Sequence, residues 1–317
     1  MTTPALTVAI PLYRSAPFLD IISANIEQLP ADAEILLSDR HGDDDAIDRL
    51  ERRHRGDRRL RCLRRRDRKD WVHNINLLLQ EARGEYWRLL PHDDSSDAAA
   101  LAALRDCLER HPRTLLAYGP TRAVDLEGRR LPERDHGNPH PVDNDAPWRL
   151  GLALDCFSRG HFNGAFKGLV RRSEIVRRQL WIRRTFGSVY SERAWLAALA
   201  LAGRMRYVAD AVYTKRFHPE SAHARWRPGP AHELSFRRIW LSYLRDGLSP
   251  ELYRRARRYV NWTTCLRLGL ATSPPPPPVE PWLPAAQEGT FASLLARVHR
   301  PHADDWRELH ALCLPAD

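Results

Sequence analysis

Short apolar segments alternate with helical patterns between residues 7 and 118 of this chain. Strand-like apolar runs occur at residues 7–11, 33–38, 60–63, 85–90 and 114–118, and helical spacing of apolar residues occurs at 15–28, 44–55, 71–83 and 98–110. A chain that forms a helix after each strand can return to the starting edge of the sheet before the next strand begins. The sequence therefore predicts an α/β fold in which helices flank a mostly parallel sheet.

Acidic side chains follow two of these predicted strands at the point where each strand ends. Asp39 comes directly after the second strand, and His92, Asp93 and Asp94 follow the strand at 85–90. In open α/β sheets, ligands bind outside the carboxyl ends of the strands. Adjacent carboxylates repel each other, and a divalent cation would offset this repulsion while binding phosphate oxygens. The pattern therefore predicts a site for a metal ion and a diphosphate.

The composition fits a folded protein that binds an anion. Of the 317 residues 43% are apolar, so the chain can bury a sizeable core, and the formal net charge is +10. This charge suits a phosphate compound or a membrane surface. We expect no nucleic-acid partner and take the arginine-rich segment 52–69 as solvated surface. Five scattered cysteines without a CxxC pair indicate neither a disulfide framework nor a zinc site.

The ends of the chain give further expectations about its organisation. The N-terminus lacks the pattern of a signal peptide and no apolar run approaches about 20 residues, so we expect a cytoplasmic protein, with the inner face of the membrane left open. Residues 125–147 read as a long loop. Residues 171–180 and 192–202 read as helices, and the pattern is helical again after residue 228, with a stiff proline-rich spacer at 273–281. We therefore expect a catalytic domain at 1–228 and a helical extension at 229–317.

Four segments of the chain together resemble family 2 glycosyltransferases of the GT-A fold, which is Rossmann-like. They are VAIPLYRSAPFL, EILLSDRHGDDD, WVHNINLLLQEARGEYWRLLPHDD and SERAWLAALALAGR, and the resemblance spans roughly residues 6–220. It implies inverting transfer of a sugar from a nucleoside-diphosphate sugar, with Mn²⁺ or Mg²⁺ as cofactor. The family's acidic DxD motif reads Pro91-His92-Asp93 here, followed by Asp94, so a proline replaces the first aspartate and the motif offers a metal one carboxylate fewer.

The resemblance assigns residues to the donor. Pro11, Tyr13 and Asp39 would line the nucleotide base, and Asn74 and Asn76 would lie near the diphosphate and the sugar. A carboxylate at position 39 can accept a hydrogen bond from the imide N–H of uracil or thymine, so UDP- and dTDP-sugars are the expected donors.

Other residues would bind the metal and the phosphates. The resemblance makes Asp93 the first metal ligand, with His92 or Asp94 assisting. His218 matches the histidine of the family's K-R-x-H element and would be the second ligand. Lys215 or Arg216 would pair with phosphate oxygens, and Gly168, like Gly164, would let the backbone approach the donor sugar.

Glu192 is the predicted catalytic base. It stands at the start of a predicted helix at 192–202, which Ser188 or Ser191 would cap. The positive end of a helix favours an ionised carboxylate, which can accept the proton of an acceptor hydroxyl. The resemblance assigns the same role to this position.

Several of these residues also have simpler interpretations. Asp39 could form a turn ahead of Gly42, the two asparagines could face solvent, and His218 could be structural. The acidic segment after residue 91 could be a loop in which Ser96 or Asp97 caps the next helix. Glu192 could merely stabilise the first turn of its helix.

Two other functions compete with glycosyl transfer. A nucleotidyltransferase usually carries a loop rich in glycine and arginine after the first strand, but PLYRSAPF contains no glycine. A catalytically silent, basic binding protein on a glycosyltransferase scaffold is the second alternative, because Pro91 replaces an acidic residue. The sequence does not name the acceptor, which could be a polysaccharide, a lipid-linked glycan, a peptide or a natural product. The arginine-rich helix at 250–270 leaves a peripheral membrane contact and a homodimer open.

Overall fold

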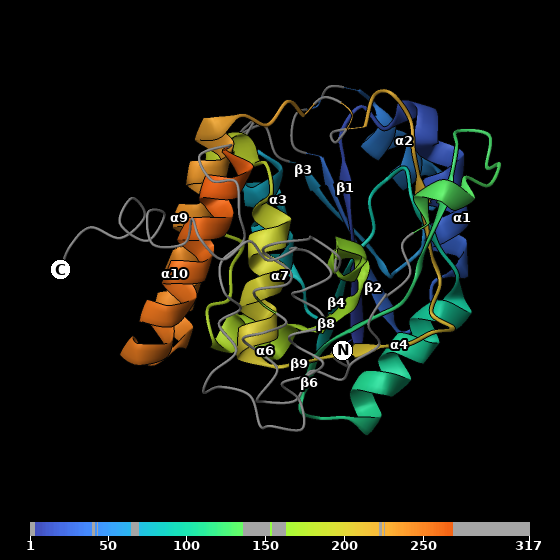
Figure 1. Cartoon of the computed structure of the whole chain (residues 1–317). Helices are drawn as coiled ribbons and strands as arrows, with labels where there is room; N and C mark the ends of the chain where they lie inside the picture. The colour runs from blue at the N-terminus through green and yellow to red at the C-terminus, as the bar shows by residue number, and fades with distance from the viewer. Residues whose placement is uncertain are drawn as a thin grey trace. The chain divides into compact units, whose positions relative to one another are not determined.

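The computed structural model describes residues 4–39, 42, 44–64, 70–135, 153, 163–221, 224 and 226–268. The chain divides into two compact units. The first comprises Met1–Asp143, Gly164–Ile182 and Met205–Arg225 and is called the sheet unit here; the second comprises Asn144–Asn163, Arg183–Arg204 and Trp226–Asp317 and is called the helical unit. Figure 1 shows the elements of both.

The main sheet carries seven strands among the described residues, in the order β3-β2-β1-β4-β8-β6-β9. They are β1 (Leu6–Leu12), β2 (Ala33–Asp39), β3 (Leu60–Arg64), β4 (Tyr86–Leu89), β6 (Thr114–Tyr118), β8 (Leu169–Arg171) and β9 (Arg204–Tyr207). β1 pairs in parallel with β2 and β4, and β2 pairs in parallel with β3. β8 runs antiparallel to β4 and β6. The prediction of a mostly parallel α/β sheet is confirmed.

Helices cover both faces of this sheet (Figure 1). Those of the sheet unit are α1 (Leu19–Gln28), α2 (Ala46–Arg53), α3 (Trp71–Glu81), α4 (Ala98–Arg110) and α6 (Arg172–Arg177), with 3₁₀ turns η1 (Ala16–Phe18), η2 (Pro132–Arg134) and η4 (Asn163–Lys167). Ile35 and Leu37 of β2 belong to one core with apolar residues of α1, α2 and α4. The next residue, Ser38, instead bonds α3, because successive side chains of a strand face opposite sides.

Local signals explain where these elements start and stop. Asp70 and Asp97 are the N-caps of α3 and α4, and each carboxylate accepts a hydrogen bond from the backbone N–H three residues on. The alternative that Asp97 is a helix cap is therefore confirmed. Gly84, between α3 and β4, lies against β1, where a Cβ atom would come 2.5 Å from the nitrogen of Thr7.

A small second sheet has the order β5-β10-β7. β10 (Tyr213–Arg216) pairs in parallel with β7 (Thr121–Val124) and antiparallel with β5 (Ser95–Ser96). This pairing brings the segment before His218 alongside the residues that follow Asp94. The sequence did not predict β5 or β7.

The helical unit contains η5 (Phe186–Ser188), α7 (Ser191–Ala202), α9 (Pro230–Gly247) and α10 (Pro250–Arg267). α9 packs against both α7 and α10, and the tryptophans Trp195, Trp240 and Trp262 are buried. The predicted C-terminal helices are thus present. None of the described helices combines the length and apolar composition needed to cross a bilayer. The proline-rich spacer at 273–281 lies outside the described residues, as does 136–147 of the expected loop, and the boundary near residue 228 stays a prediction.

Candidate functional site

The residues after β4 form what we call the acidic tip: His92, Asp93 and Asp94. The Oδ2 atom of Asp93 lies 2.9 Å from Nε2 of His218, although the two residues are 125 positions apart. Their side chains are 16% and 6% exposed, respectively. Burial alone would raise the pKa of Asp93, but the hydrogen bond with His218 and nearby positive charges hold it below its usual value. The structure therefore brings together the two residues predicted as the main metal ligands.

Asp94 points into the sheet unit. Its Oδ2 accepts a hydrogen bond from the hydroxyl of Tyr213 (2.6 Å), and its Oδ1 accepts one from the backbone N–H of Arg216 (2.8 Å). Burial and the neighbouring charge of Asp93 raise the pKa of Asp94 to about 6. In this structure the carboxylate fastens the acidic tip to β10, and its assignment as an assisting metal ligand stays a prediction.

The imidazole of His92 is held by the segment that follows β1. Its Nδ1 lies 3.1 Å from the hydroxyl oxygen of Ser15, and its ring stacks on Phe18 with 5.0 Å between centroids. The Phe18 ring also lies 5.3 Å from that of His218. Burial lowers the pKa of His92, which favours the neutral ring. The backbone N–H of Tyr13 donates to the same Ser15 hydroxyl, so β1 and the acidic tip share this anchor.

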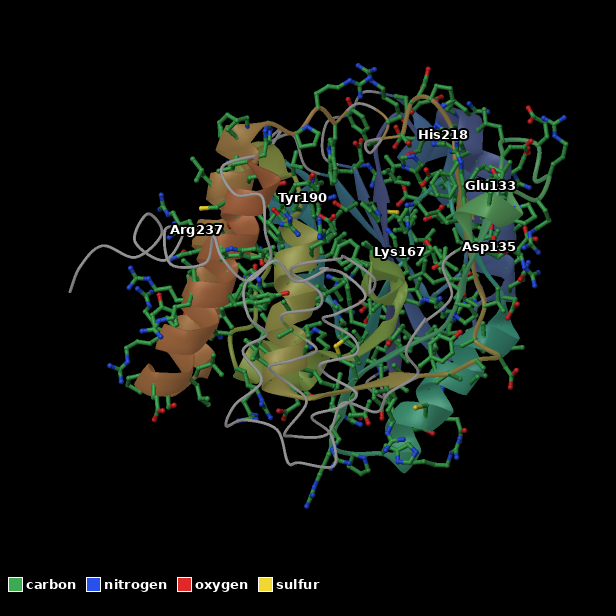
Figure 2. All side chains as sticks on the ribbon, viewed as in Figure 1. Glu133, Asp135, Lys167, Tyr190, His218 and Arg237 are labelled. Atoms are coloured by element: carbon green, nitrogen blue, oxygen red, sulfur yellow. The ribbon has the colours of Figure 1, made fainter. Side chains whose placement is uncertain are left out.

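Arg216 and Lys167 act on the acidic tip, and Lys215 precedes Arg216 in β10. The Nη1 atom of Arg216 donates to the carbonyl oxygen of Asp93 at 2.7 Å. The Nε of Arg216 is buried and meets no acceptor among the described residues. The ammonium of Lys215 lies 4.8 Å from the ring centroid of Phe217. Lys167, at the end of η4, exerts a positive charge on both Asp93 and Asp94 and lies in the sheet unit with His218 (Figure 2).

The residues expected to line the nucleotide base gather where β1 and β2 end. Leu12 of β1 is in register with Asp39 of β2, so Pro11 and Tyr13 lie at the same edge of the sheet as Asp39. Tyr13 is 45% exposed. The Oδ1 of Asp39 accepts a hydrogen bond from the backbone N–H of Gly42 at 2.9 Å. This is the turn that the simpler interpretation of Asp39 expects. Binding of the nucleotide base by Asp39 stays a prediction.

The two asparagines of α3 bond to the protein. Asn74 accepts a hydrogen bond from the hydroxyl of Ser38 (2.7 Å), which ties α3 to β2. Asn76 makes a pair of bonds to one residue: its Nδ2 donates to the carbonyl of Ile182 and its Oδ1 accepts from the N–H of Ile182, both at 2.9 Å. These two bonds use one N–H and one lone pair of the amide and explain Asn76 without a ligand, and its predicted place near the diphosphate stays a prediction.

Close packing accounts for the two glycines. A Cβ atom at Gly168 would lie 2.5 Å from the carbonyl oxygen of Ala117, where β8 meets β6. A Cβ atom at Gly164 would lie 2.9 Å from Oγ1 of Thr121. Both glycines are thus explained without a ligand, and the predicted approach to the donor sugar is untested.

Glu192 belongs to the helical unit. Tyr190 and Arg237, which Figure 2 labels, belong to the same unit. Glu192 is buried in the first turn of α7. The predicted serine cap is wrong: the N-cap is Tyr190, in the left-handed region (φ 66°), and it provides no side-chain cap. The hydroxyl of Ser191 instead bonds Thr185, at 3.1 Å to its nitrogen and 2.8 Å to its hydroxyl oxygen.

The donor atoms at the acidic tip fit a divalent cation that a substrate helps to bind. Among the described residues no cluster of three or more His, Cys, Asp or Glu side chains could hold a metal. Asp93 and His218 offer one carboxylate oxygen and one imidazole nitrogen. Mg²⁺ in phosphate-transferring sites is commonly held by one or two carboxylates plus substrate phosphates and water. A cation between Asp93 and His218 therefore fits if a diphosphate completes its coordination.

Sequence reasoning missed residues that hold this site together. The rarity of lysine could have singled out Lys167, since the chain has only two others, Lys69 and Lys215. No sequence pattern marks Asn25 of α1 as part of the site. Its amide donates to the carbonyl of Asp94 (2.9 Å) and accepts from the N–H of Ser96 (3.3 Å), so it takes the place of a neighbouring strand beside β5.

Comparison with known proteins agrees with this architecture. The family model for glycosyl transferase family 2 matches residues 7–173. Among solved structures, S. aureus TarS 1-349 in complex with UDP matches with a TM-score of 0.59 at 11% identity, covering 96% of this chain and 90% of that one. Mannosyltransferase PcManGT from Pyrobaculum calidifontis in complex with GDP-Man and Mn²⁺ matches with a TM-score of 0.53 at 18% identity, covering 98% and 84%. These likenesses show the fold. No curated protein sequence matches the chain significantly.

Proposed function

Because the chain belongs to glycosyl transferase family 2, we propose that it is an inverting glycosyltransferase that uses a UDP- or dTDP-sugar as donor. The observation that carries this proposal is the Asp93–His218 pair, with the guanidinium of Arg216 on the carbonyl of Asp93. β4, which leads to this pair, is the parallel neighbour of β1, so the pair belongs to the carboxyl edge of the sheet. Family membership is at odds with the nucleotidyltransferase alternative.

The first requirement of glycosyl transfer is a stabilised leaving group. Asp93 and His218 would hold Mn²⁺ or Mg²⁺, which when bound neutralises charge on the departing diphosphate. Arg216 and Lys215 would pair with phosphate oxygens, and the buried Nε of Arg216 is a donor available for such a contact. The complex of PcManGT with GDP-Man and Mn²⁺ supports the choice of cation.

The second requirement is a fixed nucleoside. Asp39 would accept a hydrogen bond from the imide N–H of uracil or thymine, and Tyr13, which is exposed beside it, would pack against the base. The complexes of TarS with UDP and with UDP-GlcNAc support a uridine donor. Pro11 would shape the same edge.

The third requirement is an activated acceptor. Glu192 would take the proton from the acceptor hydroxyl as its oxygen bonds to the anomeric carbon. The bond from that carbon to the phosphate oxygen breaks at the same time, and its electron pair leaves with the nucleoside diphosphate. A single displacement of this kind inverts the configuration at the anomeric carbon.

We also propose that the helical extension, residues 229–317, selects the acceptor for a catalytic domain at 1–228. Glu192 must reach the acceptor hydroxyl, and it lies in the same compact unit as α9 and α10. Helices in the same compact unit as the proposed catalytic base would therefore line the place where the acceptor binds. A polysaccharide, a lipid-linked glycan, a peptide and a natural product are the classes to be tested.

Calorimetric titration with UDP, dTDP and GDP, each with and without Mn²⁺, tests the donor site. We expect UDP and dTDP to bind more tightly than GDP. With two protein ligands, Mn²⁺ alone should bind weakly, and Mn²⁺ and UDP should raise each other's affinity by the same factor. If none of the three nucleotides binds, the silent binding protein becomes the better account.

A matched pair of variants sharpens this test. Asp39→Ala should weaken UDP binding. Asp32→Ala should leave it unchanged, because Asp32 precedes the opposite end of β2 and pairs with Arg105 at the surface (2.9 Å). Equal affinities in the two variants would remove Asp39 from the donor site. A donor-hydrolysis screen across sugar nucleotides then identifies the sugar.

A further inference from the structure

A buried arginine stands on the strand that leads to the acidic tip. Arg88 of β4 is 1% exposed. Burial lowers the pKa of Arg88 to about 10, so the guanidinium is still charged at neutral pH. A buried charge is costly unless hydrogen bonds satisfy it, and an apolar side chain of similar size would fill the same space more cheaply. The contacts of Arg88 therefore need an explanation beyond core packing.

Each contact of Arg88 reaches a segment that flanks the candidate site. Its Nε donates to the carbonyl oxygen of Lys167 (3.0 Å), and its Nη1 donates to the hydroxyl of Ser96 (2.7 Å). Its guanidinium lies 5.4 Å from the ring centroid of Tyr213. The hydroxyl of the same Tyr213 donates to Asp94. One side chain thus joins the η4 turn, β5 and β10 around the acidic tip.

The geometry points to Arg88 as a positioning residue for donor binding, an inference that rests on the proposed function. In this role Arg88, which is buried, acts through its neighbours and not by touching the donor. It bonds the backbone of Lys167 and the hydroxyl of Ser96, and its guanidinium lies against the ring of Tyr213, whose hydroxyl holds Asp94. Without Arg88 the three segments that carry Asp93, Lys167 and Arg216 lose their common anchor.

Arg59 offers a matched control within the same unit. Its guanidinium donates to the carbonyls of Leu29 (2.5 Å) and Ile26 (3.2 Å) and to the carboxylate of Asp57 (2.7 Å). It therefore ties a loop after α1 to the segment before β3, at the amino ends of β2 and β3. Its removal should cost stability, as removal of Arg88 should, without disturbing the acidic tip.

The experiment compares Arg88→Met, Arg88→Lys and Arg59→Met. Urea unfolding gives the stability of each variant, and calorimetry on folded protein gives the dissociation constant for UDP, with and without Mn²⁺. We expect both methionine variants to be less stable than the wild type. Arg88→Met should bind UDP with Mn²⁺ about tenfold more weakly, the size of effect seen when residues supporting a metal ligand are lost. Arg59→Met should bind as the wild type does, and Arg88→Lys, which keeps the charge, should fall between.

Each outcome decides something. If Arg88→Met loses stability but binds UDP like the wild type, Arg88 serves the core alone and the inference is wrong. If Arg88→Met does not fold, Ser96→Ala, which removes one of its acceptors, should weaken UDP binding by a smaller factor, and unchanged binding there overturns the inference. If the wild type binds no nucleoside diphosphate, the proposed function fails and the inference fails with it.

Discussion

Asn76→Asp distinguishes a role of this side chain in the fold from a role at the diphosphate. The amide of Asn76 donates to the carbonyl of Ile182 and accepts from its N–H, each at 2.9 Å. Aspartate keeps the accepting oxygen. It replaces the donating nitrogen with a second oxygen, which then faces the carbonyl oxygen of Ile182 at the former bond distance.

The cost follows from these two contacts. Loss of one hydrogen bond costs about 1 kcal/mol, and leaving the Ile182 carbonyl opposite a carboxylate adds about 1 kcal/mol, because water reaches the half-buried side chain and screens the repulsion. For a chain of this size, about 2 kcal/mol lowers the melting temperature by about 4 °C. The same substitution should leave the affinity for UDP within about twofold of the wild type, because no donor contact is lost.

Gln80→Glu is the control, since it makes the same chemical change on the exposed side of the same helix. Thermal unfolding and calorimetric UDP binding are measured on the wild type and both variants. We expect Gln80→Glu to match the wild type in both measurements. A loss of about tenfold or more in UDP affinity for Asn76→Asp, with an unchanged melting temperature, would refute our reasoning and place Asn76 at the diphosphate.

Three further predictions concern single side chains. Glu192→Gln should abolish transfer and leave donor binding largely intact, as measured by turnover and calorimetry; unchanged turnover would remove Glu192 from the mechanism. Asp94→Asn should gain stability relative to the wild type as pH rises from 4 to 7 in urea unfolding, because a folded-state pKa of about 6 lies above the unfolded value, so the wild type loses stability through this window; a constant difference would contradict the raised pKa. Burial raises the pKa of Cys62 to about 11, so its alkylation by iodoacetamide at pH 8 should be about a hundredfold slower than that of a free cysteine, and a normal rate would contradict it.

Elements with a strong local pattern were predictable from the sequence. The expected strands at 33–38 and 114–118 correspond to β2 and β6, and the expected helix at 98–110 is α4. These segments are long enough for apolar periodicity to show, and Asp97 marks the start of α4. β5 and β7 carry no such pattern, because two to four residues become strands only through their pairing with β10.

The helix after β8 shows a different limit. The sequence predicts a helix at 171–180, whereas α6 ends at Arg177. Gln179 adopts a left-handed conformation (φ 56°), and the N–H of Leu180 bonds back to the carbonyl of Ile175 at 2.9 Å. Glycine or asparagine usually marks the end of a helix of this kind, and neither is present, so no local signal predicts that the helix ends there.

The site was predictable in part. The resemblance alone relates Asp93 to His218, since local spacing cannot relate residues 125 positions apart. Contacts within the protein already explain Asn76 and Gly168, so the structure gives no separate support for their predicted roles at the donor. Arg88 carries no local signal, because a single basic residue in a short strand looks like an outward-facing position, and its burial depends on partners from three other segments.

The adjacent carboxylates of the acidic tip divide two tasks between them. From the sequence we expect a cation to offset the repulsion between Asp93 and Asp94. In the structure Asp94 turns inward and bonds Tyr213 and the Arg216 backbone, and its pKa of about 6 reflects both its burial and the remaining repulsion from Asp93. Asp93 stays partly exposed beside His218 with a lowered pKa. Two acids whose environments push their pKa values apart suit different roles: Asp94 holds β10 in place, and under the proposed function Asp93 is the carboxylate that would bind the cation.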